Sequence, residues 1–227
     1  MFACFTTKGG SGCTVFSALT ALALARTGDG PGVLAVDLGG DLPAALGIAD
    51  PAGPGLAEWL GAEEDPPPDA LARLEVSARP GLSLLPRGAV AITVSSRAAL
   101  LTRHLLSDPR PVVVDVGNIA SADLADAAAA LRRAFVAAAS RAWLVTRPCY
   151  LALRASRGSG AVPDGVVVMS EPGRALGAAD VADVIGAPVV LELDVDPAIA
   201  RAVDAGLLGT RIPHGARRVL ERALATT

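Results

Sequence analysis

Residues 8–14, Lys-Gly-Gly-Ser-Gly-Cys-Thr, place three glycines beside a lysine, a threonine and a cysteine in one short segment. Glycines let the backbone approach a phosphate closely, so that several amide hydrogens point at it, and a helix that begins there adds partial positive charge. The hydroxyl of Thr14 is of the type that ligates magnesium in loops of this kind. The segment therefore predicts a loop that binds a phosphate group.

Lys8 is the only lysine of the chain, and the other nineteen of the twenty Lys and Arg residues are arginines. A bias toward arginine is a property of composition, so a single lysine inside a glycine-rich loop indicates a position that requires an ammonium group. The alternative is an ordinary solvated lysine placed there by chance. The flanking glycines favour the phosphate loop.

Short apolar runs alternate with helical patterns along the chain. Most runs are continuously apolar over four to six residues, which is typical of strands covered on both faces. The alternation predicts an α/β fold with a doubly wound, mostly parallel sheet of seven or eight strands and helices on both faces, with ligands bound at the carboxyl ends of the strands. The expected strands are Phe2–Thr7, Gly32–Asp37, Leu82–Leu85, Pro111–Val116, Ala142–Thr146, Val166–Met169 and Val189–Leu193. The expected helices are Thr14–Arg26, Ser96–Leu106, Ala122–Ala139, Ala178–Ile185, Pro197–Gly206 and Ala216–Ala225.

The composition is that of an ordered globular protein, with 52% hydrophobic and 19% charged residues. A single domain over residues 1–227 is expected, interrupted by an acidic, proline-rich excursion at residues 58–79. The net charge of −3 gives no general attraction to nucleic acid or anionic lipid. Neither a transmembrane segment nor a secretory signal is visible, which predicts a cytoplasmic protein.

The loop resembles the deviant Walker A motif, KGGxGK[ST], of the ParA/MinD family of P-loop ATPases, and the resemblance extends from about residue 1 to residue 215. Val33–Asp41 resembles the family's second strand and switch I region, and Leu82–Gly88 resembles its third strand and following turn. Val112–Asp115 matches a Walker B strand. Residues 193–206 are similar to the last strand and helix of the branch related to the pilus-localisation proteins CpaE and TadZ.

The resemblance implies a P-loop NTPase fold and a site for ATP and Mg²⁺. In the family, the lysine that matches Lys8 reaches across a dimer to the partner's phosphates. The family's residue at the position of Thr14 ligates magnesium, and its residues at the positions of Asp37 and Asp115 hold the ion or its waters. Lys8, Asp37 and Asp115 are thus the expected catalytic residues. The residues expected around the phosphates are Lys8, Gly9, Gly10, Ser11, Gly12, Cys13, Thr14 and Val15.

The family also implies partners and a place of action. A nucleotide-dependent homodimer is expected, together with an unidentified protein cargo. The implied role is to position pilus or secretion machinery, a division site or partitioned DNA. The implied location is the cytoplasm, including the periphery of the membrane or a cell pole.

Several departures from the family pattern fall on the chemistry. Cys13 replaces the lysine that grips the β- and γ-phosphates, which removes charge-assisted hydrogen bonds worth about 1.5–3 kcal/mol each. Gly39 replaces a second aspartate that helps to place the attacking water, and Asp41 is the one nearby substitute. Ser170 stands where an asparagine reads the adenine edge, and Val116-Gly117-Asn118 replaces the usual Ser/Thr-Pro after the Walker B strand.

These departures predict nucleotide binding weakened by about tenfold to a hundredfold. Because phosphoryl transfer depends on positioning and charge neutralisation, hydrolysis is expected to be very slow or absent. The sequence thus favours a ParA/MinD-like positioning protein with a degenerate ATP site that acts as a scaffold or localisation factor. The alternative is an active ATPase that dimerises with ATP. An iron–sulfur relative is disfavoured because the three cysteines show no pairing.

Cys13 has two interpretations. A thiol at a helix N-terminus near Lys8 could have a lowered pKa and act as a redox-sensitive group. The other interpretation, which we favour, is a tolerated small residue in a retired site.

Two further surfaces invite comparison with the family. Clustered arginines could bind the DNA backbone nonspecifically, although arginine-rich solvated faces are the favoured alternative. The C-terminal residues 217–224 have apolar positions at helical spacing, but their shortness favours packing on the sheet over insertion into a membrane. The two arginine sets are Arg132, Arg133, Arg141, Arg147, Arg154 and Arg157, and Arg211, Arg217, Arg218 and Arg222.

Overall fold

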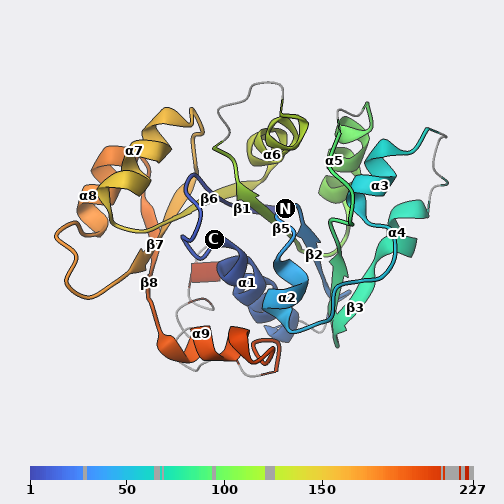
Figure 1. Cartoon of the computed structure of the whole chain (residues 1–227), viewed down its shortest axis with the longest axis horizontal. Helices are drawn as coiled ribbons and strands as arrows, with labels where there is room; N and C mark the ends of the chain where they lie inside the picture. Colours follow the sequence, from blue (N-terminus) through green and yellow to red (C-terminus); the bar gives the residue numbers. More distant parts are fainter. Residues whose placement is uncertain are drawn as a thin grey trace.

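An eight-stranded sheet forms the centre of the molecule, with the strand order β3-β4-β2-β5-β1-β6-β7-β8. Every neighbouring pair is parallel except β3 with β4, which is antiparallel at the edge. The computed structural model of the chain describes residues 1–27, 30–63, 67, 69–93, 96–120, 126–210, 212, 220 and 223–224. The predicted fold class, a doubly wound and mostly parallel sheet, is confirmed (Figure 1).

The elements follow one another in the alternating order that a doubly wound sheet requires. The strands are β1 (Phe2–Thr6), β2 (Val33–Asp37), β3 (Val76–Arg79), β4 (Leu82–Leu85), β5 (Val112–Asn118), β6 (Arg141–Thr146), β7 (Gly165–Ser170) and β8 (Val189–Asp194). The helices are α1 (Cys13–Thr27), α2 (Leu42–Leu46), α3 (Leu56–Gly61), α4 (Ala70–Leu74), α5 (Ala98–Ser107), α6 (Ala127–Ala138), α7 (Tyr150–Gly158), α8 (Ala178–Ile185) and α9 (Pro197–Asp204).

Helices cover both faces of the sheet. The first face packs against α1, α2 and α9, and its core includes Cys4 of β1 and Phe16 of α1. The second face packs against α3, α4, α5 and α6, and its core includes Phe5 of β1 and Phe135 of α6. A smaller apolar cluster joins α7 and α8 to β7. Consecutive residues of β1 therefore point to opposite faces, as strand geometry requires.

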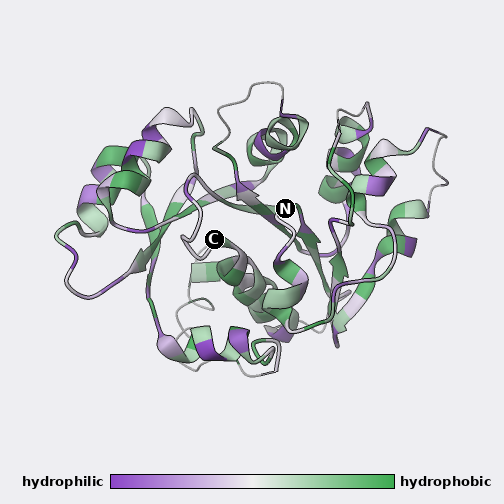
Figure 2. Cartoon of the chain, in the orientation of Figure 1, coloured by the Kyte–Doolittle hydropathy of each residue, from purple (hydrophilic) through white to green (hydrophobic). Residues whose placement is uncertain are grey.

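Burial explains the composition of α1. Its residues from Phe16 to Ala23 are all buried, and Figure 2 shows the helix as hydrophobic along nearly its whole length. A helix that is apolar around its circumference belongs inside a protein, and α1 packs against both the sheet and α2. The sheet and α1 together hold the loop of residues 7–12 between two rigid elements.

All seven expected strands are present, and the structure adds an eighth, β3. This strand and α4 lie inside the excursion at residues 58–79, which therefore contributes an edge strand and a helix with one buried side chain, Leu71. Helices α2, α3 and α7 are further elements that the sequence pattern did not predict. The expected helix Ala216–Ala225 lies almost wholly outside the described residues.

None of the described helices is both long and apolar enough to cross a membrane.

Candidate functional site

The loop that follows β1 has the backbone that its glycines predict. Gly10 and Gly12 adopt φ angles of 76° and 85°, in the left-handed region that glycine enters without strain. The hydroxyls of Ser11 and Thr6 donate to the carbonyl oxygen of Lys8 at 2.8 and 3.0 Å. These bonds engage the Lys8 carbonyl and use no amide hydrogen from Gly9 to Gly12.

The loop has both the donors and the room for an anion. Within the described part of the chain, the backbone amides of Gly9, Gly10, Ser11 and Gly12 donate to no acceptor. A methyl group built on Gly9 or Gly10 would meet nothing within 4 Å. Such a run of free amides before a helix N-terminus is an anion-binding concavity. Lys8 is exposed beside it.

Two carboxylates lie side by side beneath the loop. Asp37 of β2 and Asp115 of β5 are direct neighbours in the register of these two parallel strands. Both point to the face covered by α1, because each lies two residues beyond a core residue of that face, Ala35 or Val113. Their exposed fractions are 1% and 0%. The structure thus brings the two predicted magnesium-binding positions together.

Asp115 has one satisfied oxygen and one unsatisfied oxygen. Its Oδ1 accepts from the Ser17 hydroxyl at 3.0 Å and from the Cys13 thiol at 3.6 Å. Its Oδ2 is buried and has no hydrogen-bond partner among the described residues. Burial raises the pKa of Asp115, although hydrogen bonds from Thr14 and Ser17 oppose the rise.

Asp37 lies in a similar environment. Its Oδ1 accepts from the backbone amide of Gly40 at 2.7 Å. Burial raises the pKa of Asp37 to about 7; the Gly40 amide opposes this rise and the charge of Asp115 adds to it. Two buried carboxylates this close repel each other when both are ionised. A cation between them would relieve that repulsion.

Magnesium fits the chemistry of this cluster. The ion prefers oxygen ligands and is usually bound by one or two carboxylates together with substrate phosphates and water. The unpartnered Oδ2 of Asp115 and the hydroxyl of Thr14 are oxygens of the required type. Within the described residues, no three His, Cys, Asp or Glu side chains gather closely enough to hold a metal alone. A magnesium ion here would therefore need further oxygen ligands, of the kind that phosphate and water supply.

Cys13 lies under the loop. It is 5% exposed, and its thiol donates to Asp115. Burial, followed by the negative charge of Asp115, raises the pKa of the Cys13 thiol well above its ordinary value. The hypothesis of a lowered thiol pKa is therefore wrong, because the desolvation of the sulfur outweighs the positive end of the helix. The structure favours a small buried residue, as in our preferred interpretation.

The segment after β2 closes over the carboxylates. A Cβ built on Gly39 would lie 3.1 Å from Oδ2 of Asp115 and 3.7 Å from Oδ1 of Asp37. Gly117, with a φ of 72°, packs against Gly39 so closely that its own Cβ would lie 3.2 Å from the Gly39 Cα atom. The alternative water-placing residue, Asp41, is exposed. Gly39 therefore has no side chain at the position where the family pattern has a carboxylate.

The departure at Ser170 lies at the end of β7. The Ser170 hydroxyl donates to Oε1 of Glu192 on β8 at 2.6 Å. Met169 of the same strand reaches the loop, since its Cε would lie 3.5 Å from a Cβ built on Gly12. This end of β7 thus adjoins the loop, but the Ser170 hydroxyl already donates its hydrogen to Glu192.

Three arginines of the first expected cluster have partners within the fold. Arg147 pairs with Glu171, and Arg132 and Arg133 donate to backbone carbonyls of Leu38 and Ile119. The second set, from Arg211 to Arg222, lies outside the described residues.

Three residues near the site were not assigned to it from the sequence. Ser17 donates to Asp115 from the second turn of α1, and its signal in the sequence is a polar residue on a largely apolar helix. Arg87 is the second residue after β4, whose carboxyl end lies beside that of β2. Arg132 was grouped only with a basic cluster. Its contact with the segment after β2 depends on α6 folding back over the sheet.

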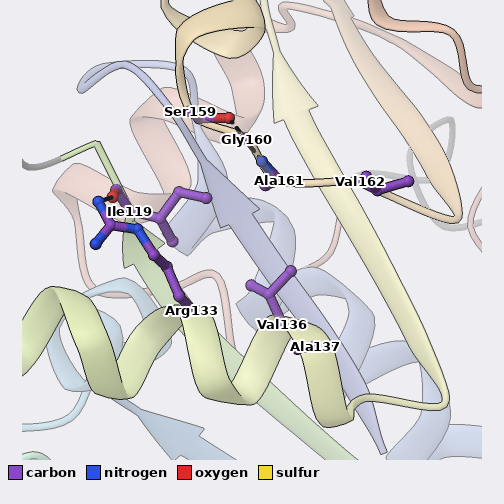
Figure 3. A pocket seen from close by; sticks show the side chains of 8 residues that line it. All are labelled: Ile119, Arg133, Val136, Ala137, Ser159, Gly160, Ala161 and Val162. Atoms are coloured by element: carbon purple, nitrogen blue, oxygen red, sulfur yellow. Dashed lines mark hydrogen bonds between the residues drawn. The ribbon is translucent and has the colours of Figure 1, made fainter.

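A separate cavity of about 360 Å³ lies between α6 and residues 159–162. Figure 3 shows it bounded by Ile119, Arg133 and Val136 on one side and by Ala161 and Val162 on the other. Its lining is largely apolar and includes none of the predicted site residues. The chemistry of the loop and the carboxylates therefore lies elsewhere.

No protein-family model matches the sequence, and no curated protein is significantly similar to it.

Solved structures match the fold over almost the entire chain. The ParA family ATPase from Chlorobium tepidum aligns with a TM-score of 0.75 at 19% identity, covering 100% of this chain and 98% of that one. The septum site-determining protein MinD from Pyrococcus horikoshii, complexed with Mg-ADP, aligns with a TM-score of 0.73 at 20% identity, covering 99% and 95%. A variant of McdA from Cyanothece, in complex with ATP, aligns with a TM-score of 0.66 at 15% identity, covering 99% and 96%. The chain therefore has the P-loop NTPase type of α/β fold found in ParA/MinD family ATPases.

Proposed function

We propose that this chain is a ParA/MinD-type nucleotide-binding protein with a degenerate ATP site, which holds Mg-nucleotide weakly and hydrolyses it very slowly or not at all. In this role it acts as a scaffold or localisation factor for a protein cargo. The cargo would belong to pilus or secretion machinery, a division site or a DNA partition system. The proposed location is the cytoplasm, at the periphery of the membrane or at a cell pole.

One observation carries the proposal: free loop amides lie above two buried carboxylates, but the lysine and the water-placing carboxylate are replaced by Cys13 and Gly39. The amides and the unpartnered oxygen of Asp115 supply ligands for a phosphate and its magnesium ion. The buried thiol of Cys13 supplies no positive charge, and Gly39 supplies no acceptor for a water proton. Binding is thus favoured over catalysis.

The solved structures with nucleotides support the ligand assignment. MinD of Pyrococcus horikoshii was solved with Mg-ADP and the McdA variant of Cyanothece with ATP. Both share this fold over nearly the full chain. The glycine-rich loop and the two carboxylates lie at the carboxyl ends of the strands. A doubly wound sheet binds its ligands at those ends.

A nucleotide-dependent homodimer is part of the proposal. Lys8 is exposed after β1, and Tyr150 and Leu151, which begin α7 after the neighbouring strand β6, are 69% and 57% exposed. The carboxyl ends of two parallel neighbours meet at one edge of the sheet, so an ammonium group and an apolar pair share that edge. Such a surface suits a second copy of the chain that brings its own phosphates. Sedimentation with and without Mg-AMPPNP, on the natural protein and Lys8→Ala, tests this part.

The second candidate is an active, ATP-dependent dimerising ATPase. Asp41 favours it, because this exposed carboxylate lies close enough to Asp37 to raise its pKa. A movement of residues 39–41 on nucleotide binding would be needed to bring Asp41 to the attacking water.

Calorimetric titration with Mg-ATP and Mg-ADP, paired with a phosphate-release assay, tests the main proposal. The natural protein is expected to bind weakly and to release phosphate near the background rate. Cys13→Lys should strengthen binding by about tenfold to a hundredfold, since it restores charge-assisted hydrogen bonds to phosphate. Cys13→Ser is the matched control, because it changes the thiol without adding charge and should leave the affinity nearly unchanged.

Three results would count against the proposal. Turnover that Asp115→Ala abolishes would instead identify the active ATPase. Tight ATP binding by the natural protein would contradict the degenerate site. Failure of both the natural protein and Cys13→Lys to bind either nucleotide would remove the nucleotide function altogether.

A further inference from the structure

Two arginines from different elements reach the segment that follows β2. Arg132 of α6 donates from Nη2 to the carbonyl oxygen of Leu38 at 2.9 Å. Nη1 of Arg87, which follows β4, would lie 3.1 Å from a Cβ built on Gly40. Leu38 and Gly40 flank Gly39, the residue that closes over the two carboxylates. Both guanidinium groups therefore lie at the carboxyl ends of β2, β4 and β5, beside the predicted magnesium site.

Neither arginine has an ion-pair partner among the described residues, whereas Arg73, Arg110 and Arg147 each pair with a carboxylate. The Nε atoms of Arg87 and Arg132 are buried and donate no hydrogen bond within the part of the chain that the structure describes. Burial and the charge of Arg87 lower the pKa of Arg132, while Asp126, Asp115 and Asp37 oppose the fall. The two positive groups are thus close enough to repel each other.

Two half-buried guanidinium groups whose charges repel each other, each with a buried Nε that has no acceptor among the described residues, cost free energy. A cavity of about 220 Å³ adjoins Arg87, and its lining includes Asp37, Gly40 and Asp50. An arginine presents a planar set of donors that matches phosphate oxygens, and its charge is retained in partly buried sites. An anion that enters from the loop would satisfy both groups and end their mutual repulsion.

We propose that Arg87 and Arg132 form an anion-binding wall of the nucleotide site and contact the terminal phosphate of a bound nucleoside triphosphate. They would supply the positive charge that Cys13 cannot. This inference rests on the proposed nucleotide function, and it adds a preference for triphosphate over diphosphate. The loop amides hold the phosphates common to both nucleotides, while the two guanidinium groups recognise only the additional one.

Arg133 offers a matched control on the same helix. It also donates to a backbone carbonyl, that of Ile119 at 3.3 Å. Figure 3 shows its side chain at the cavity between α6 and residues 159–162, which is not the cavity that Asp37 and Arg87 line. Replacement of Arg133 therefore removes a guanidinium of similar contacts without touching the proposed wall.

The experiment compares calorimetric binding of Mg-AMPPNP and Mg-ADP to the full-length natural protein and to Arg87→Gln, Arg132→Gln and Arg133→Gln. Arg87→Gln and Arg132→Gln should each weaken AMPPNP binding by about tenfold or more and leave ADP binding within about twofold, since only the triphosphate loses a charge-assisted contact. Arg133→Gln should leave both affinities unchanged. Arg87→Lys should recover part of the AMPPNP affinity, and thermal melting should show that all variants fold.

Different failures are distinguishable. If the natural protein binds ADP but neither glutamine variant changes the ratio of AMPPNP to ADP affinity, the wall is overturned and the nucleotide function stands. An equal loss for both nucleotides shows that the arginines only hold the segment after β2 in place, which also overturns the wall. Binding of neither nucleotide by the natural protein overturns the nucleotide function together with this inference.

Discussion

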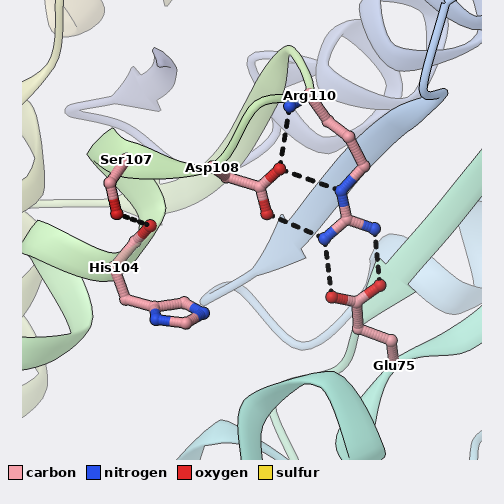
Figure 4. A network of polar contacts seen from close by, with 5 residues as sticks. All are labelled: Glu75, His104, Ser107, Asp108 and Arg110. Carbon is pink, nitrogen blue, oxygen red and sulfur yellow. Dashed lines mark hydrogen bonds and ion pairs between the residues drawn. The ribbon is translucent and has the colours of Figure 1, made fainter. Parts of the chain in front are cut away.

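Two groups of charged side chains lie along β5 and differ in how they are satisfied. The first comes just before the strand, where Arg110 contacts both Asp108 and Glu75 (Figure 4). Its guanidinium donates to Glu75 through two bonds of 2.7 Å and to Asp108 through bonds of 2.8 and 2.9 Å. The second lies around Asp115 within the strand, where a buried carboxylate oxygen has no partner among the described residues.

The pKa values of the two groups move in opposite directions. Burial alone would raise the pKa of Asp108, but hydrogen bonds from Arg110 outweigh it and leave the pKa below its ordinary value. Burial raises the pKa of Asp115 and outweighs the hydrogen bonds from Thr14 and Ser17 that oppose the rise. Asp115 is fully buried, whereas Asp108 is only partly buried at residue level. The difference between their pKa values therefore reflects both the guanidinium beside Asp108 and the deeper burial of Asp115.

The contrast separates a structural network from a ligand site. Buried polar atoms are nearly always satisfied in native proteins, so an unsatisfied one calls for an explanation. Groups with perturbed ionisation gather at functional sites. The Arg110 network joins α4–β3 to α5–β5, whereas the Asp115 cluster leaves a buried oxygen unpartnered among the described residues, which is the ground for the proposed cation and anion site. Four substitutions measure this difference.

The largest effect is expected for Arg110→Ala. The substitution leaves the carboxylates of Asp108 and Glu75 without their cation, in positions where side-chain exposure is only 8% and 16%. The free energy of unfolding should fall by about 3 kcal/mol, at the lower end of the cost of breaking a buried pair. Urea unfolding measures the change. Arg103→Ala, at an exposed position of α5, is the control and should change stability by less than about 0.5 kcal/mol.

The sequence predicted the site better than it predicted this network. Loop residues 8–14, Asp37 and Asp115 could be placed together because each directly follows or lies in an apolar strand, and parallel strands bring such positions to one edge. The network unites Glu75 with Arg110, 35 positions apart. No periodicity of the chain specifies that contact.

The elements that were missed have local explanations. β3 has only four residues and is one of the sheet's edges, so Val76–Arg79 gives too short a pattern to separate it from the excursion. α7 begins with Tyr150 and Leu151 on its exposed side, which blurs the apolar spacing on which helix prediction depends. The thiol of Cys13 illustrates a third limit, because its pKa depends on burial against Asp115 and not on the helix N-terminus alone.

Asp108→Asn tests the pH dependence of the satisfied network. Loss of the charge should lower the free energy of unfolding at pH 7 by about 2 kcal/mol, the scale of a hydrogen bond to a charged group. The pKa of Asp108 is lower in the folded protein than in the unfolded chain, so the unfolded state binds more protons as the pH falls below about 4. The advantage of the natural protein over the variant should therefore shrink below that pH.

Urea unfolding of both proteins between pH 7 and pH 2.5 measures this gap. His104 also lies near Asp108, so the series should be repeated with His104→Gln in both backgrounds. A gap that stays constant as the pH falls below about 4 would show that the Asp108 carboxylate gains nothing from its ionisation.

Asp115→Asn should have a smaller effect of opposite sign. In the metal-free and nucleotide-free protein it removes a buried charge whose Oδ2 has no partner among the described residues. The melting temperature should rise by about 2–4 °C, which corresponds to roughly 1 kcal/mol for a domain of this size. Asp164→Asn is the control: Asp164 already accepts a hydrogen bond from the Ala142 amide at 2.7 Å, so its loss should not stabilise the protein. A fall in melting temperature for Asp115→Asn would place this carboxylate with the structural network.

The smallest effect on stability is expected for Arg73→Ala. This variant tests whether a single ion pair, without a second carboxylate, stabilises the protein as the Arg110 network does. Arg73 pairs with Asp69 at 2.7 Å along α4, but their side chains are 70% and 56% exposed. Water screens such a pair, so stability should change by less than about 0.5 kcal/mol, and less still at high salt. Urea unfolding could instead show that Arg73→Ala lowers the free energy of unfolding as much as Arg110→Ala does. The contribution of each arginine to stability would then depend on its distance to the carboxylate and not on burial or on a second partner. The contrast along β5 would then lose its physical basis, because Arg110 differs from Arg73 in exposure and in its second carboxylate and hardly at all in distance.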